Sequence, residues 1–95
     1  MRTVVAQPFP SDPLIKEAAN LGQFIRAART QSGLTLADAA LSLGIAKQTL
    51  QDLERGKPTV SFGLVLRVAQ GLGVAVFAQP AATRDYARQC LQGTP

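Results

Sequence analysis

The sequence predicts an all-α fold, a bundle of four to five helices followed by one short C-terminal strand. Apolar residues recur at intervals of three and four over most of the chain, which places them on one face of successive helices. Glycines and prolines interrupt these runs where helices would end. The β-branched stretch Val74–Ala78 follows the last central helix and has the composition of a strand.

The chain has the size and composition of one globular domain. Its 95 residues are 46% hydrophobic, and no apolar run approaches the ~18 residues that a membrane span needs. The apolar part of the N-terminus is too short for a signal peptide. Cys90 has no partner for an internal disulfide, which favours a reducing cytoplasm. A core this small would gain stability from association of two copies.

The residue types present argue against an enzyme. Histidine is absent, which removes the commonest general base and the commonest metal ligand. The carboxylates are scattered, and no glycine-rich phosphate loop is present. We therefore expect no catalytic residue, no metal and no cofactor. A net charge of +4 suits a polyanionic partner, because a basic surface releases counterions from phosphates.

The N-terminal part of the chain is expected to be an arm followed by a helix. Residues 1–12 form the arm, which carries a short apolar patch. Ser11 or Asp12 can cap a helix whose first position is Pro13. Gly22 is a possible break in this helix.

Two short helices are predicted on either side of Gly44. Thr35 opens the first, and Asp38 three residues later completes a capping pattern. The second covers about Lys47–Arg55, and glycine gives the bend its backbone freedom. This is the pattern of a helix-turn-helix, whose second helix commonly enters the major groove of DNA.

A further helix and the strand complete the predicted domain. Ser61 caps a helix over residues 62–72. The strand after it cannot satisfy its hydrogen bonds alone, so it needs the Val4–Val5 patch or the same strand of a second copy. Its dimerisation residues would be Val74, Ala75, Val76, Phe77 and Ala78. The predicted parts are an arm (1–12), a DNA-binding domain with its dimerisation strand (13–80) and a tail (81–95) with a short helix near residues 84–91.

A series of residues between Leu21 and Phe77 has the spacing of one known family. They are Ile25-Arg26-x-x-Arg29, Gly33-Leu34-Thr35, Ala40, Leu43-Gly44-Ile45, Thr49-Leu50, Leu53-Glu54-Arg55-Gly56-Lys57-Pro58 and Leu72-Gly73-Val74. This pattern resembles the Xre-type, lambda-repressor-like helix-turn-helix family. The strand after the last helix resembles the HipB-like antitoxin branch, in which that strand pairs with its twin in a homodimer.

The resemblance implies a DNA-binding face on the second helix of the motif. Lys47, Gln48 and Thr49 would point into the major groove, where glutamine pairs with adenine and lysine donates to guanine. The alternative is a solvated polar face. Arg55 and Lys57 would contact phosphates, which position a protein without reading sequence. The candidate DNA-binding residues are Lys47, Gln48, Thr49, Gln51, Asp52, Arg55, Lys57, Leu36 and Ala46.

Three of these candidates depart from the family pattern. Leu36 stands where the family often has glutamine against the DNA backbone. Ala46 stands where serine or threonine is the usual helix cap. Asp52 repels phosphates, although it can accept a hydrogen bond from cytosine.

The resemblance also assigns a structural ion pair. Arg29 and Glu54 would form a salt bridge that ties the first helix to the end of the recognition helix. The alternative is that they are two independent surface charges.

The function that follows is sequence-specific transcriptional repression by a homodimer on a palindromic operator in double-stranded DNA. The HipB-like resemblance implies an antitoxin that represses its own operon and neutralises a HipA-like kinase toxin. The alternatives are a free-standing Xre-family regulator, or a protein-binding module with weak DNA binding.

Overall fold

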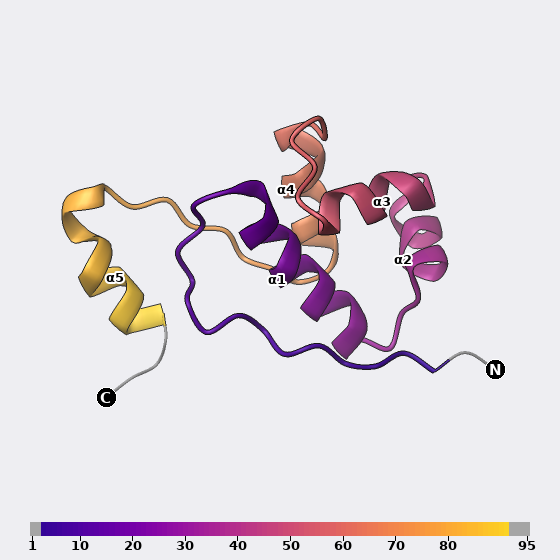
Figure 1. Cartoon of the computed structure of the whole chain (residues 1–95), viewed down its shortest axis with the longest axis horizontal. Helices are drawn as coiled ribbons and strands as arrows, with labels where there is room; N and C mark the ends of the chain where they lie inside the picture. Colours follow the sequence, from indigo (N-terminus) through magenta and orange to yellow (C-terminus); the bar gives the residue numbers. More distant parts are fainter. Residues whose placement is uncertain (1–2, 92–95) are drawn as a thin grey trace.

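The computed structural model describes residues 3–91, and its regular elements are all helices, joined by coil (Figure 1). These residues contain no strand, so the all-α class is confirmed. The elements are α1 (Ala18–Gln31), α2 (Leu36–Leu43), α3 (Lys47–Glu54), α4 (Phe62–Gly71), the 3₁₀ turn η1 (Ala81–Thr83) and α5 (Arg84–Leu91).

The first helix begins later than the sequence predicts. It starts at Ala18, so the predicted start at Pro13 is wrong. The physical reason is a competing turn: Asn20 Oδ1 accepts hydrogen bonds from the N–H groups of Lys16 and Glu17, at 2.8 and 3.0 Å. A side-chain acceptor of this kind favours a helix cap over continued helix. Glu17 and Asn20 then close a capping box on α1.

The core lies where α1, α3 and α4 meet. Ile25 of α1, Leu50 of α3 and Val68 of α4 are fully buried. The other buried members of this cluster are Leu21, Ala39, Ala40, Leu53 and Ala69. Because one cluster includes residues from all four of the first helices, it fixes the direction in which α3 presents its outer face.

Gly22 sets the distance between α1 and α3. It lies inside α1 without breaking it. A Cβ atom at this position would lie 2.5 Å from the backbone oxygen of Glu54 and 2.7 Å from that of Leu53. Since real side chains do not approach a backbone oxygen so closely, only glycine fits here.

The predicted strand at residues 74–78 is wrong for the chain that the structure describes. These residues run as coil between α4 and η1 (Figure 1). The N–H of Val74 donates to the carbonyl of Ala69 at 2.8 Å and so completes the end of α4. The arm is engaged elsewhere, because the Gln7 N–H donates to Thr30 Oγ1 at 2.9 Å. Without a second strand, a β-branched stretch has nothing to pair with.

Helix α5 lies apart from the core helices, at the opposite end of the molecule from α2 (Figure 1). It occupies the part of the tail where a short helix is predicted, and none of its residues is buried. Arg88 holds it to the arm through Asp12, with Nε 3.0 Å from Oδ1. The backbone N–H of Leu14 and the Arg88 guanidinium lower the pKa of Asp12. Residues 1–2 of the predicted arm and 92–95 of the predicted tail lie outside the described residues.

Candidate nucleic-acid interface

The two helices of the motif are joined by a three-residue turn. Thr35 caps α2 as predicted, because its Oγ1 accepts a hydrogen bond from the N–H of Asp38 at 3.1 Å. Gly44 ends α2 with φ of 70°, a left-handed conformation that glycine adopts without strain. Ala46 precedes α3 and supplies no side-chain cap. The chain therefore turns sharply from α2 into α3, as a helix-turn-helix requires.

Helix α3 has one buried face and one outward face. Leu50 and Leu53 point into the core. Lys47 and Gln48 are exposed in its first turn, and Thr49 is half-buried. The start of α3 is therefore a polar surface on a helix that the core holds in place.

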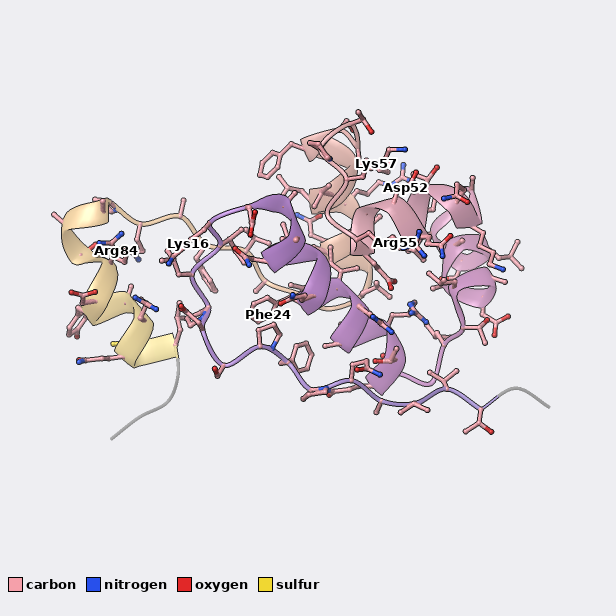
Figure 2. The ribbon with its side chains drawn as sticks, viewed as in Figure 1. Lys16, Phe24, Asp52, Arg55, Lys57 and Arg84 are labelled. Carbon is pink, nitrogen blue, oxygen red and sulfur yellow. The ribbon has the colours of Figure 1, made fainter. Side chains whose placement is uncertain are left out.

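Asp52 organises the outward face of α3. Its Oδ1 accepts a hydrogen bond from Gln48 Nε2 at 2.9 Å, and its Oδ2 lies 3.7 Å from Lys57 Nζ. The carboxylate thus has two partners within the chain, and the amide of Gln48 has a defined orientation. Figure 2 shows Asp52 on α3, near Arg55 and Lys57 at the end of that helix. The spacing of four residues between Gln48 and Asp52 is the sequence signal that could have revealed this bond.

Arg29 and Glu54 form a buried, two-point ion pair. Arg29 Nε lies 2.6 Å from Glu54 Oε2, and a second bond joins its guanidinium to Oε1 at 3.0 Å. The remaining nitrogen of the fork donates to the carbonyl of Leu34 at 2.8 Å. The side chains are only 8% and 6% exposed. One arginine therefore joins α1 to the end of α3 and to the loop before α2.

The other candidate residues divide between the outer face and the core. Leu36 is half-buried and packs against the hydrophobic core, so its side chain stabilises the fold rather than presenting a polar group. Ala46 and Arg55 are exposed, and Gln51 is half-buried on α3. The predicted dimerisation residues lie on the coil after α4.

The remaining observations concern metal ligands, membrane spans and the cysteine within residues 3–91. These residues hold no group of three or more Cys, Asp or Glu side chains arranged to bind a metal ion. None of their helices is long and apolar enough to cross a membrane. Cys90 is an exposed free cysteine on α5.

Comparison with known proteins agrees with this geometry. Residues 20–77, more than half of the chain, match the family model described as a helix-turn-helix domain. The chain is also 37% identical over 62 residues to the uncharacterized HTH-type transcriptional regulator y4mF of Sinorhizobium fredii, a match that spans 65% of this chain and 82% of that protein. The chain therefore belongs to the helix-turn-helix domain family, of the Xre-like kind that its motif residues predict.

Proposed function

We propose that this protein is a DNA-binding transcription regulator that represses by occupying an operator. The observation that carries the proposal is the exposed polar start of α3, on a helix anchored by the core and by the Arg29–Glu54 pair. In helix-turn-helix proteins this helix lies in the major groove. The similar Sinorhizobium protein is named as a transcriptional regulator, which supports the same function.

The residues that contact the bases lie in the first turn of α3. The ammonium of Lys47 donates to guanine O6 and N7, and the amide of Gln48 pairs with adenine. Asp52 orients that amide through the 2.9 Å hydrogen bond. Thr49 joins this contact surface, while Arg55 and Lys57 contact phosphates and set the register of the protein on the duplex.

A homodimer is the second part of the proposal. Phe62 on α4 and Phe77 on the following coil are 67% and 68% exposed, and Val76 is 42% exposed. Burial of these side chains against a second copy would stabilise both chains, since apolar area removed from water is the main source of association energy. Two recognition helices about one turn of DNA apart, ~34 Å, then match a palindromic operator. The bound dimer blocks polymerase sterically.

The antitoxin role is a finer proposal and rests on the resemblance to the HipB-like branch. Its partner would be a HipA-like kinase toxin encoded in the same operon. A kinase-like gene next to this one, whose product co-purifies with the chain and loses toxicity, would support it. An isolated gene would favour a free-standing regulator.

A protein-binding module with weak DNA binding is the second candidate function. The observations that favour it are the side chain of Leu36, which packs against the core and offers no polar group to a DNA backbone, and the start of α3, which Ala46 leaves without a side-chain cap. This candidate predicts little binding to any duplex, even at low salt.

Replacing Lys47 and Gln48 together by alanine is expected to weaken operator binding about 100-fold. Each good base contact contributes about 1–3 kcal/mol of discrimination, and two are lost. Fluorescence anisotropy on the DNA upstream of the gene measures the change. The matched control is Lys16→Ala with Gln70→Ala, since both side chains are exposed and lie outside α3. Retained binding by the first variant would refute the assignment of the reading residues, and no binding by the unaltered protein would favour the module.

Replacing Asp52 by asparagine is expected to strengthen binding to scrambled DNA about fivefold and to reduce the preference for the operator. One negative charge facing phosphate is removed, and unit charges 4 Å apart in water interact by about 1 kcal/mol. Lys57 also loses its partner at 3.7 Å and becomes free for phosphate. Asp85→Asn, which makes the same charge change on exposed α5, is the control. Equal effects of the two variants would mean that Asp52 contributes only net charge.

A further inference from the structure

An apolar hollow of about 630 Å³ lies between α5 and the rest of the domain. Helix α5 lines it with Ala87 and Leu91. The segment before α1, helix α4 and the coil after α4 contribute Ile15, Leu66 and Phe77. Figure 1 shows that α5 stands away from the core helices, at the end of that coil. The volume lies within the range of about 300–1,000 Å³ that is usual for small-molecule sites.

The charged side chains of this hollow are cationic. Within residues 3–91, its lining includes Arg84 and Arg88 and no aspartate or glutamate. The guanidinium of Arg88 is occupied, because its Nε lies 3.0 Å from Asp12 Oδ1. Arg84 lies on α5 (Figure 2), and its side chain makes no ion pair or hydrogen bond with any residue in this range. The hollow therefore combines apolar walls with one cation that no carboxylate of the described chain neutralises.

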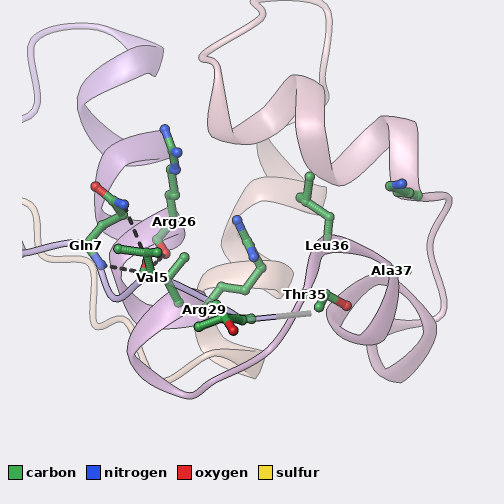
Figure 3. Close-up of a pocket in the computed structure, with 11 residues that line it drawn as sticks. Val5, Gln7, Arg26, Arg29, Thr35, Leu36 and Ala37 are labelled. Atoms are coloured by element: carbon green, nitrogen blue, oxygen red, sulfur yellow. Dashed lines mark hydrogen bonds between the residues drawn. The ribbon is translucent and has the colours of Figure 1, made fainter. Parts of the chain in front are cut away.

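A second hollow, of about 420 Å³, has a different character (Figure 3). It lies between the arm, α1 and the starts of α2 and α3, and most of the residues that line it are polar. Figure 3 shows Gln7 and Arg26 on one side of it and Thr35 on another. An aliphatic chain would find no continuous apolar wall there, so the hollow beside α5 is the better site for an apolar ligand.

We propose that the hollow beside α5 binds a free medium-chain aliphatic carboxylate, with its chain against Ile15, Leu66 and Phe77 and its carboxylate on Arg84. Removal of apolar surface from water supplies the main driving force. A guanidinium can bind both oxygens of a carboxylate, so the free charge of Arg84 selects an anionic head group. The ligand also contacts both sides of the hollow. It would therefore hold α5, which has no buried residue of its own, against the domain.

The ligand and a second copy of the chain would cover the same side chains. Phe62, Val76 and Phe77 line the hollow, and they are the residues that the proposed dimer buries. A bound carboxylate therefore favours the monomer by mass action, and it weakens operator binding because the dimer binds two half-sites. This part of the inference rests on the proposed function, whereas the ligand site itself does not require a dimer.

Isothermal titration calorimetry with decanoate, below the concentration at which it forms micelles, tests the site directly. Octanoate is expected to bind about 15-fold more weakly, since each buried CH₂ contributes about 0.8 kcal/mol. Decyltrimethylammonium has a chain of the same length and a cationic head, and it is expected to bind at least tenfold more weakly than decanoate. Absence of decanoate binding would overturn the site. Binding to phosphatidylglycerol vesicles without binding to decanoate would overturn it in favour of a membrane surface.

Arg84→Gln is expected to weaken decanoate binding about tenfold, the effect of losing one charge-assisted hydrogen bond. Arg26→Gln is the matched control, because it removes the same charge from an exposed residue in the other hollow (Figure 3). Normal binding by Arg84→Gln, or an equal loss in both variants, would overturn the assignment of the carboxylate to Arg84.

Ala87→Phe provides an independent test, since its ring would occupy the hollow and is expected to weaken decanoate binding at least tenfold. Gln89→Phe places the same ring on α5 at an exposed position outside the lining, and normal binding is expected. None of the α5 residues is buried, so both variants keep the core intact, and thermal melting checks this. Normal binding by Ala87→Phe would place decanoate elsewhere and overturn the site.

Sedimentation velocity and fluorescence anisotropy on the upstream DNA, each with and without saturating decanoate, test the link to the proposed function. The dimer is expected to dissociate, and operator affinity is expected to fall, in the unaltered protein but not in Ala87→Phe. Decanoate binding with an unchanged dimer would overturn the competition between the ligand and the second copy. A chain that is monomeric without ligand would contradict the proposed dimer, and calorimetry would still decide the ligand site.

Discussion

Replacing Arg29 by methionine is expected to lower the free energy of unfolding by about 3–5 kcal/mol, because it leaves a buried carboxylate without a partner. Glu54 is only 6% exposed and takes both of its strong hydrogen bonds from this arginine. The carbonyl of Leu34 loses its donor as well. Native proteins have only about 5–15 kcal/mol of stability, so this loss would be a large fraction of the total. Urea denaturation followed by circular dichroism measures the loss.

A double variant shows whether the loss comes from the unpaired charge. Arg29→Met combined with Glu54→Leu removes both charges and fills the space with apolar atoms, so it is expected to recover most of the lost stability. The double-mutant cycle then gives the coupling between the two residues. A loss below about 1 kcal/mol in the single variant would mean that the pair behaves like an exposed surface bridge.

The helices α2 to α4 could be predicted from the sequence because the residues that start and end them are close together in the chain. The side chain of Thr35 accepts a hydrogen bond from the backbone N–H three residues later, at the start of α2, and Ser61 does the same at the start of α4. In each case the cap and its donor lie within one turn of the same helix. The turn at Gly44 follows in the same way from a residue that tolerates a left-handed backbone. Caps, turns and apolar spacing within one helix need no knowledge of the rest of the fold.

The two wrong predictions, the helix start at Pro13 and the strand at residues 74–78, concern backbone N–H groups that had more than one possible acceptor. Asn20 takes the N–H groups that a helix starting at Pro13 would have used. Val74 gives its N–H to the end of α4, and no strand lies beside residues 74–78 in the part of the chain that the structure describes. The preference of β-branched residues for strands depends on a neighbouring strand, which the sequence of one chain does not reveal.

The candidate site was likewise predictable only in part. The position of Lys47 and Gln48 at the start of α3 follows from the motif. The bond that engages Asp52 with Gln48 depends on side-chain conformations on the folded surface, so the sequence left its role open.

Replacing Gly22 by alanine is expected to destabilise the domain by about 3 kcal/mol, near the upper end of the usual cost of overpacking. The added methyl group would lie 2.5 and 2.7 Å from two backbone oxygens at the end of α3. Backbone atoms cannot move aside by rotating a side chain, so α3 itself must shift away from α1. That shift would also stretch the buried pair between Arg29 and Glu54, which spans the same two helices.

Gly63→Ala is the matched control for this test. A Cβ at Gly63 meets nothing within 4 Å, and the residue is the second of α4. Alanine is favoured over glycine in a helix by up to about 1 kcal/mol, so this variant is expected to be more stable than the unaltered protein. Thermal melting shows whether each variant is less stable or more stable than the unaltered protein. If Gly22→Ala were also stabilising, α1 and α3 would have room to separate at little cost. The direction of α3, and with it the reading face, would then depend on the remaining core contacts and not on this close approach.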